Sequence, residues 1–176
     1  ELQKFWLREI TSFKKIGKKR GRIELLCGLI FNRFDGFIDT SALDRLIRNT
    51  IHRENLLKSP VQFYACTVDV SSGEPVYATA QACPDIHDYI IGSTAIPMVM
   101  PVRIIRGNPY VDGGIREVAP LKSAIDHGAD RIYCILCQTT DAGQTAFHSK
   151  NPVELMDRLM GIMTNETITN DIRHCE

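Results

Sequence analysis

Apolar side chains recur at every third or fourth position in several stretches of the chain, which is the spacing of one face of a helix. The capping cluster Asp39-Thr40-Ser41 and the early proline Pro120 mark where two of these stretches begin. The pattern predicts helices over residues 2–16, 22–34, 42–52, 85–91, 120–127 and 151–170.

Shorter stretches in the middle of the chain have the composition of β-strands. The turn Ser71-Ser72-Gly73-Glu74 joins two of them into a predicted hairpin. One stretch, 131–137, is almost continuously apolar, as in a central strand that is covered on both faces. Strands are predicted over residues 61–70, 75–80, 102–105, 109–111 and 131–137. Because helices alternate with buried strands, the predicted fold class is α/β.

The length and composition of the chain are those of one packed domain, with 176 residues, 44% of them hydrophobic and 24% charged. We expect a single domain over 1–176, with a helical region over 1–60, a sheet core over 61–140 and a C-terminal helix over 151–170. No apolar run reaches the length of about 18 residues that a spanning helix needs.

The charges balance, with 21 Lys and Arg against 21 Asp and Glu. This balance argues against a dedicated nucleic-acid binder, which would carry a basic excess. Most of the six cysteines lie in apolar stretches, so we expect buried thiols in a reducing compartment and therefore a cytoplasmic protein. Cys134 and Cys137 form a C-x-x-C without a second such pair, so no metal site and no cofactor are expected.

A basic run separates the first two predicted helices. Such a run is more often a solvated, charge-rich loop. The alternative is peripheral contact with anionic lipid headgroups at a membrane surface. The residues of the run are Lys14, Lys15, Lys18, Lys19, Arg20 and Arg22.

The motif Pro109-Tyr110-Val111-Asp112-Gly113-Gly114 places a carboxylate at the end of a predicted strand. Sites in open α/β sheets gather at strand ends, and a carboxylate there can accept a proton from a nearby hydroxyl. Taken alone, Asp-Gly-Gly is more often a turn with an Asx-type cap.

The surroundings of Asp112 resemble the patatin-like phospholipase family. Gly92-Ser93-Thr94-Ala95-Ile96-Pro97 precedes the motif, and Val118-Ala119-Pro120-Leu121 and His127-Gly128-Ala129-Asp130 follow it. The resemblance covers roughly residues 1–140 and is most specific over 92–130. It implies a three-layer α/β/α fold with a mostly parallel central sheet, here incomplete on its N-terminal side.

The resemblance also implies a function, that of a lipid acyl hydrolase of the phospholipase A or esterase type. In that family a serine and an aspartate form a catalytic dyad, and Asp112 stands at the position of the aspartate, the general base. Ser93, next to Gly92, could be considered as a substitute nucleophile, but the resemblance implies that it stands in a structural loop that supports the site. The residues expected to shape the site are Gly113, Gly114, Ser93 and Pro97.

The sequence departs from the family pattern in one respect. No serine lies in a Gly-x-Ser-x-Gly motif, and the glycine-rich oxyanion loop is also missing. We therefore expect the chain to be the C-terminal portion of a catalytic domain and to be inactive alone. The alternative is a non-catalytic remnant of the same fold that binds lipid or protein.

Overall fold

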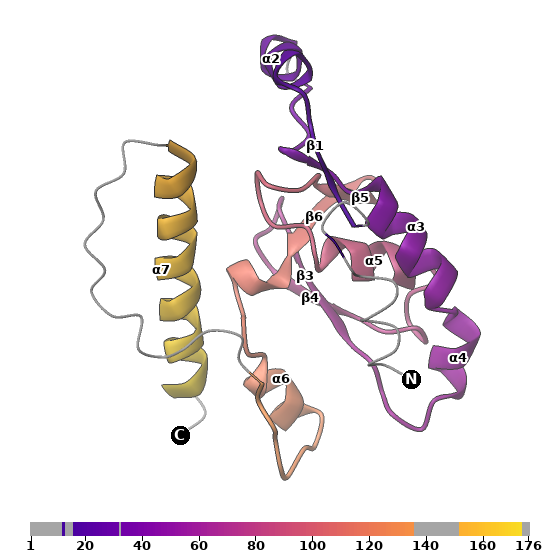
Figure 1. Cartoon of the computed structure of the whole chain (residues 1–176). Helices are drawn as coiled ribbons and strands as arrows, with labels where there is room; N and C mark the ends of the chain where they lie inside the picture. Colours follow the sequence, from indigo (N-terminus) through magenta and orange to yellow (C-terminus); the bar gives the residue numbers. More distant parts are fainter. Residues whose placement is uncertain (1–11, 13–15, 32, 136–151, 174–176) are drawn as a thin grey trace. The chain divides into compact units, whose positions relative to one another are not determined.

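The computed structural model describes residue 12 and residues 16–31, 33–135 and 152–173 (Figure 1). The chain divides after Asp112 into two compact units, which are described separately below. The predicted helix over residues 2–16 lies outside the described residues, apart from residues 12 and 16.

The first unit is built on a four-stranded sheet with the strand order β4-β3-β6-β5. Its strands are β3 (Ala65–Asp69), β4 (Pro75–Ala78), β5 (Arg103–Ile105) and β6 (Asn108–Asp112). The hairpin predicted around Ser71–Glu74 is confirmed, because β3 pairs with β4. A second hairpin joins β5 to β6 through Arg106 and Gly107, which both have positive φ.

The α/β class is confirmed, but the mostly parallel sheet is not, because every pairing among the described strands is antiparallel. Both hairpins explain this physically, since a tight turn returns the chain in the opposite direction. Parallel neighbours would need a longer crossover connection. The third pairing of the sheet, between β3 and β6, joins distant segments and is antiparallel as well.

Two helices pack in succession on the sheet of the first unit. α5 (Ile86–Gly92) packs on β3, β5 and β6, and α3 (Ser41–Thr50) packs on α5. The expected capping cluster starts α3, where the Asp39 carboxylate accepts hydrogen bonds from the N–H and the hydroxyl of Ser41. The remaining elements of this unit are β1 (Lys18–Lys19), α2 (Arg22–Ile30), β2 (Ile38–Asp39) and α4 (Arg53–Lys58).

The core of the first unit lies between α5 and the sheet. Ile86 is fully buried, and the rings of Tyr89 and Tyr110 meet edge to face with centroids 5.4 Å apart. Edge-to-face pairs of this kind stabilise by about 0.5–1.5 kcal/mol beyond the area they bury. The contact therefore fixes α5 against β6, the strand that ends in Asp112.

The second unit contains the short 3₁₀ helix η2 (Gly113–Ile115), α6 (Leu121–Asp126) and α7 (Pro152–Arg173). One carboxylate oxygen of Asp171, near the end of α7, accepts the backbone N–H groups of Val118 and Ala119 at 3.0 Å each. These bonds tie α7 to the segment that follows η2. Among the described helices, none is both long and apolar enough to cross a bilayer.

One expectation for the second half of the chain is corrected. Residues 131–135 of the predicted strand 131–137 form no strand, and Tyr133 and Ile135 are exposed. An apolar run becomes a central strand only where neighbours pair with its backbone, and no described strand does so.

The cysteines are also less buried than the sequence predicts. Cys27 and Cys134 are exposed, and Cys66 and Cys83 are half-buried. Cys27 lies on α2, which has no buried residue, and Cys134 lies in the segment that joins no sheet. Cys137 lies outside the described residues.

Candidate active site

Asp112 is the last residue of β6 and is half-buried. It lies opposite Thr67 of β3, a fully buried residue in the middle of the sheet. Its backbone N–H donates to the carbonyl oxygen of Ala95 at 3.0 Å. The end of β6 is thus held by a neighbouring strand and by the loop between α5 and β5.

That loop, residues 93–102, begins as a cap on α5. The Ser93 hydroxyl donates to the carbonyl of Ile90 at 2.9 Å, and the Thr94 hydroxyl donates to that of Ile91 at 2.8 Å. Helix ends leave carbonyl groups without partners inside the helix, and these two hydroxyls satisfy two of them. The Ser93 hydroxyl therefore donates its proton to the helix end.

The far side of the loop is clamped by residues 36–38. The N–H groups of Phe37 and Ile38 both donate to the carbonyl of Val99, each at 3.0 Å. Gly36 has φ +76°, and a Cβ there would lie 2.7 Å from the carbonyl carbon of Met100. Only glycine allows this approach, because any side chain would collide with the loop backbone. Pro97 lies half-buried within the loop.

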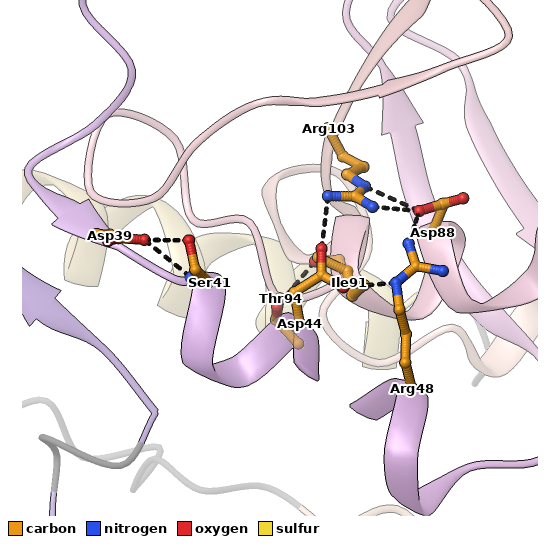
Figure 2. Close-up of polar contacts among 8 residues, drawn as sticks. All are labelled: Asp39, Ser41, Asp44, Arg48, Asp88, Ile91, Thr94 and Arg103. Carbon is orange, nitrogen blue, oxygen red and sulfur yellow. Dashed lines mark hydrogen bonds and ion pairs between the residues drawn. The ribbon is translucent and has the colours of Figure 1, made fainter. Parts of the chain in front are cut away.

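An ion-pair network joins α3, α5 and β5 (Figure 2). The Arg103 guanidinium contacts Asp44 at 2.9 Å and also contacts Asp88. Arg48 contacts Asp44 at 2.6 Å and likewise reaches Asp88. Asp88 lies on α5 before the loop and Arg103 is the first residue of β5 after it, so the network connects both ends of the loop.

The charges of this network set the protonation of Asp88. Burial alone raises the pKa of the Asp88 carboxyl, but hydrogen bonds and positive charge from Arg103 and Arg48 outweigh it. The net result is a pKa below the ordinary value of 3.8. Asp88 is therefore a carboxylate near neutral pH, and its role is to hold Arg103 and Arg48 in place.

Close packing brings α5 near the sheet at Gly92. A Cβ added there would lie 3.1 Å from the Thr67 methyl carbon and 3.7 Å from the Arg103 Cβ. The absence of a side chain lets the end of α5, and with it the start of the loop, approach β3 and β5. Gly92 thus places Ser93 and Ala95 beside the strand that carries Asp112.

The predicted site residues fall into two groups. Ser93, Pro97 and Asp112 belong to the first unit, where the loop and the end of β6 lie together. Gly113 and Gly114 begin the second unit as the first residues of η2. The carbonyl of Gly113 accepts the N–H groups of Arg116 and Glu117, both at 2.9 Å, which closes a tight turn directly after Asp112.

The family comparison agrees with this arrangement. Residues 1–125, which include the loop and Asp112, match the family model described as patatin-like phospholipase. The chain belongs to the patatin-like phospholipase family. A search of curated proteins finds no match. Membership of the patatin-like family suggests a lipid hydrolase with lipid substrates.

Several positioning features of this patatin-like chain do not follow from its motifs. The i,i+4 spacing of Asp44 and Arg48 is a recognisable signal for a helix ion pair. Nothing in the sequence indicates that Arg103 joins them. Asp35-Gly36 is recognisable as a turn, but its contact with the loop depends on two segments more than 60 residues apart.

Proposed function

We propose that the protein is a lipid acyl hydrolase in which Asp112 is the general base of a Ser-Asp dyad. The proposal holds that its serine partner is contributed by residues outside these 176 and that this chain alone is inactive. The observation that carries it is the position of Asp112, a half-buried carboxylate at a strand end inside the stretch that matches the family.

The backbone around Asp112 supports the proposal. A general base must be held within hydrogen-bond reach of the proton that it accepts. Asp112 is held by β3 on one side and by the Ala95 carbonyl on the other. The Ser93 hydroxyl donates to Ile90, which supports a structural role for Ser93 over a nucleophilic one.

The proposed reaction proceeds in two steps. Asp112 accepts the serine proton as the serine oxygen bonds to the acyl carbon of the ester, and then passes that proton to the departing alcohol. Water next attacks the acyl carbon of the acyl-enzyme and gives a proton to Asp112, which forms a tetrahedral intermediate in which the bond between the acyl carbon and the serine oxygen is still intact. When that bond breaks, the proton returns to the serine and the fatty acid is released.

The test uses the protein encoded by the complete reading frame that contains this sequence. Asp112→Asn should lower kcat for hydrolysis of a fatty-acyl ester by about 100-fold or more while the protein stays folded. Asp69→Asn is the matched control, because Asp69 ends the neighbouring strand β3 and its carboxylate caps a turn at Ser71. Activity that survives Asp112→Asn would remove Asp112 from the mechanism.

The second candidate function is a non-catalytic module that binds lipid or protein, favoured by the lack of a Gly-x-Ser-x-Gly motif. The complete protein would then hydrolyse no ester, and Asp112→Asn would leave its binding to lipid vesicles unchanged. We also propose a cytoplasmic location at a membrane surface, with basic residues of the segment 14–22 contacting anionic headgroups.

A further inference from the structure

The helix α2 carries an exposed apolar face. None of its nine residues is buried. Ile23 is 80% exposed, Leu26 59% and Ile30 64%, and Leu29 is similarly exposed. Soluble proteins rarely leave a contiguous apolar patch in water, and such patches mark surfaces that bind a partner or a membrane.

These four side chains share one side of the helix. At about 100° per residue, Ile23, Leu26, Leu29 and Ile30 span an arc of about 120°. Gly28 lies on the opposite side, where a Cβ would be 3.3 Å from the carbonyl oxygen of Arg33. The chain therefore folds back behind α2 and leaves the apolar face pointing away from it.

Three exposed cations lie next to this face along the chain. Lys18 and Lys19 are exposed on β1, which directly precedes α2 (Figure 1). Arg22 is the exposed first residue of α2, and helical spacing places it within the same arc. Among the described residues, no acid lies within ion-pair distance of these three cations.

Arg20 differs from its neighbours. Its guanidinium contacts Glu24 at 2.8 Å and Asp35 at 3.1 Å. These two carboxylates neutralise its charge within the protein. Arg20 therefore stabilises the local structure and is not one of the cations offered to a membrane. Lys14 and Lys15 lie outside the described residues. The basic run therefore contributes Lys18, Lys19 and Arg22 to this surface.

We propose that the outer face of α2, with Lys18, Lys19 and Arg22 beside it, docks the protein on a bilayer that contains anionic lipid. An exposed apolar helix face with cations beside it in the chain is typical of a helix that lies in the membrane interface. Nine residues span about 14 Å, far less than the ~30 Å hydrocarbon core, so the contact is peripheral. The proposal rests on the membrane contact proposed above for segment 14–22 and does not depend on the role of Asp112.

The first test measures binding of the 176-residue chain to phosphatidylcholine vesicles with and without phosphatidylglycerol. Binding should require phosphatidylglycerol and weaken as salt rises. Lys18→Gln with Lys19→Gln should weaken it about 25-fold, at roughly fivefold for each cation. The control Lys58→Gln with Lys122→Gln removes two exposed cations elsewhere and should leave it unchanged.

The second test separates insertion of the helix from attraction of charge alone. Leu26→Ser with Ile30→Ser should reduce binding at least tenfold, whereas Val61→Ser with Ile104→Ser, at equally exposed apolar positions, should not. In a Trp6→Phe background, the fluorescence of a Leu26→Trp variant should be quenched by brominated phosphatidylcholine in mixed vesicles. The fluorescence of a Val61→Trp variant in the same background should remain unquenched.

Three results would overturn the proposal. The first is vesicle binding that neither the two lysine substitutions nor the two apolar substitutions on α2 reduce. The second is fluorescence of the Leu26→Trp variant that brominated lipid does not quench. The third is loss of stability or of self-association in the Leu26→Ser, Ile30→Ser protein without vesicle binding in the parent. That result would assign the face to the chain's own residues or to a second copy. Ester hydrolysis is measured separately, so failure here leaves the proposed reaction standing.

Discussion

The backbone N–H of Asp112 donates to the carbonyl oxygen of Ala95 at 3.0 Å. This bond joins the end of β6 to a loop that starts as the cap of α5 and is clamped from behind by residues 36–38. The position of the Asp112 backbone is therefore coupled to a segment far from it in sequence. Changes that displace the loop should also displace Asp112.

The close approach of Gly36 to the loop gives a first prediction. Gly36→Ala places a Cβ 2.7 Å from the carbonyl carbon of Met100 and must adopt a positive φ. A positive φ costs about 1–2 kcal/mol for alanine. The collision with backbone should add about 2 kcal/mol or more. Urea unfolding measures the sum as a loss in the free energy of unfolding.

Gly73→Ala is the matched control, because Gly73 has the same φ of +76° and nothing within 4 Å of its added Cβ. The free energy of unfolding of Gly73→Ala should fall only by the cost of the positive φ, about 1–2 kcal/mol. Equal losses in the two variants would show that the loop yields to Gly36→Ala without cost and that the clamp is not rigid.

The ion-pair network makes stability depend on pH. The pKa of Asp88 is lowered in the folded protein, so its charge stabilises the fold above the unfolded value of about 3.8. That stabilisation is lost as pH falls from the unfolded pKa through the lower folded pKa. Asp88→Asn should lower stability at pH 7 by about 1–3 kcal/mol and flatten the loss below pH 4.

The measurement is the free energy of unfolding across acidic pH for both proteins. Asp126→Asn removes a carboxylate from an exposed position on α6 and should change stability at pH 7 by no more than about 0.5 kcal/mol. If the free energy of unfolding of Asp88→Asn fell with acidic pH as steeply as that of the parent protein, the Arg103 contact would not stabilise the charged form of Asp88.

Asp171 provides a prediction for the second unit. Its carboxylate accepts the N–H groups of Val118 and Ala119, and Asp171→Ala removes both bonds. The local opening free energy should fall by about 1–3 kcal/mol, so those two amides should exchange hydrogen roughly five- to 150-fold faster. Glu166→Ala, at an exposed position on α7, should leave both rates unchanged. Unchanged exchange in Asp171→Ala would mean that other contacts hold the segment.

Much of the local structure is predictable from the sequence. Helical spacing places α3 within one or two residues of its observed bounds, and the Ser71–Glu74 turn locates the first hairpin. These features depend on neighbours within a few residues, so periodicity and turn chemistry suffice. The stretch 131–137 shows the limit, because its apolar run indicates a strand but cannot supply the partner strands that would pair with it.

The sequence by itself determined the α/β class, the family and the place of Asp112 at a strand end, since each follows from local pattern or an ordered motif. Only the tertiary structure decided that Arg103 joins Asp88 and that Val99 meets residues 36–38. It also decided that the apolar face of α2 stays exposed. The physical reason is that a pattern reports which face of an element is apolar or charged, whereas burial and pairing depend on what the folded chain brings against that face.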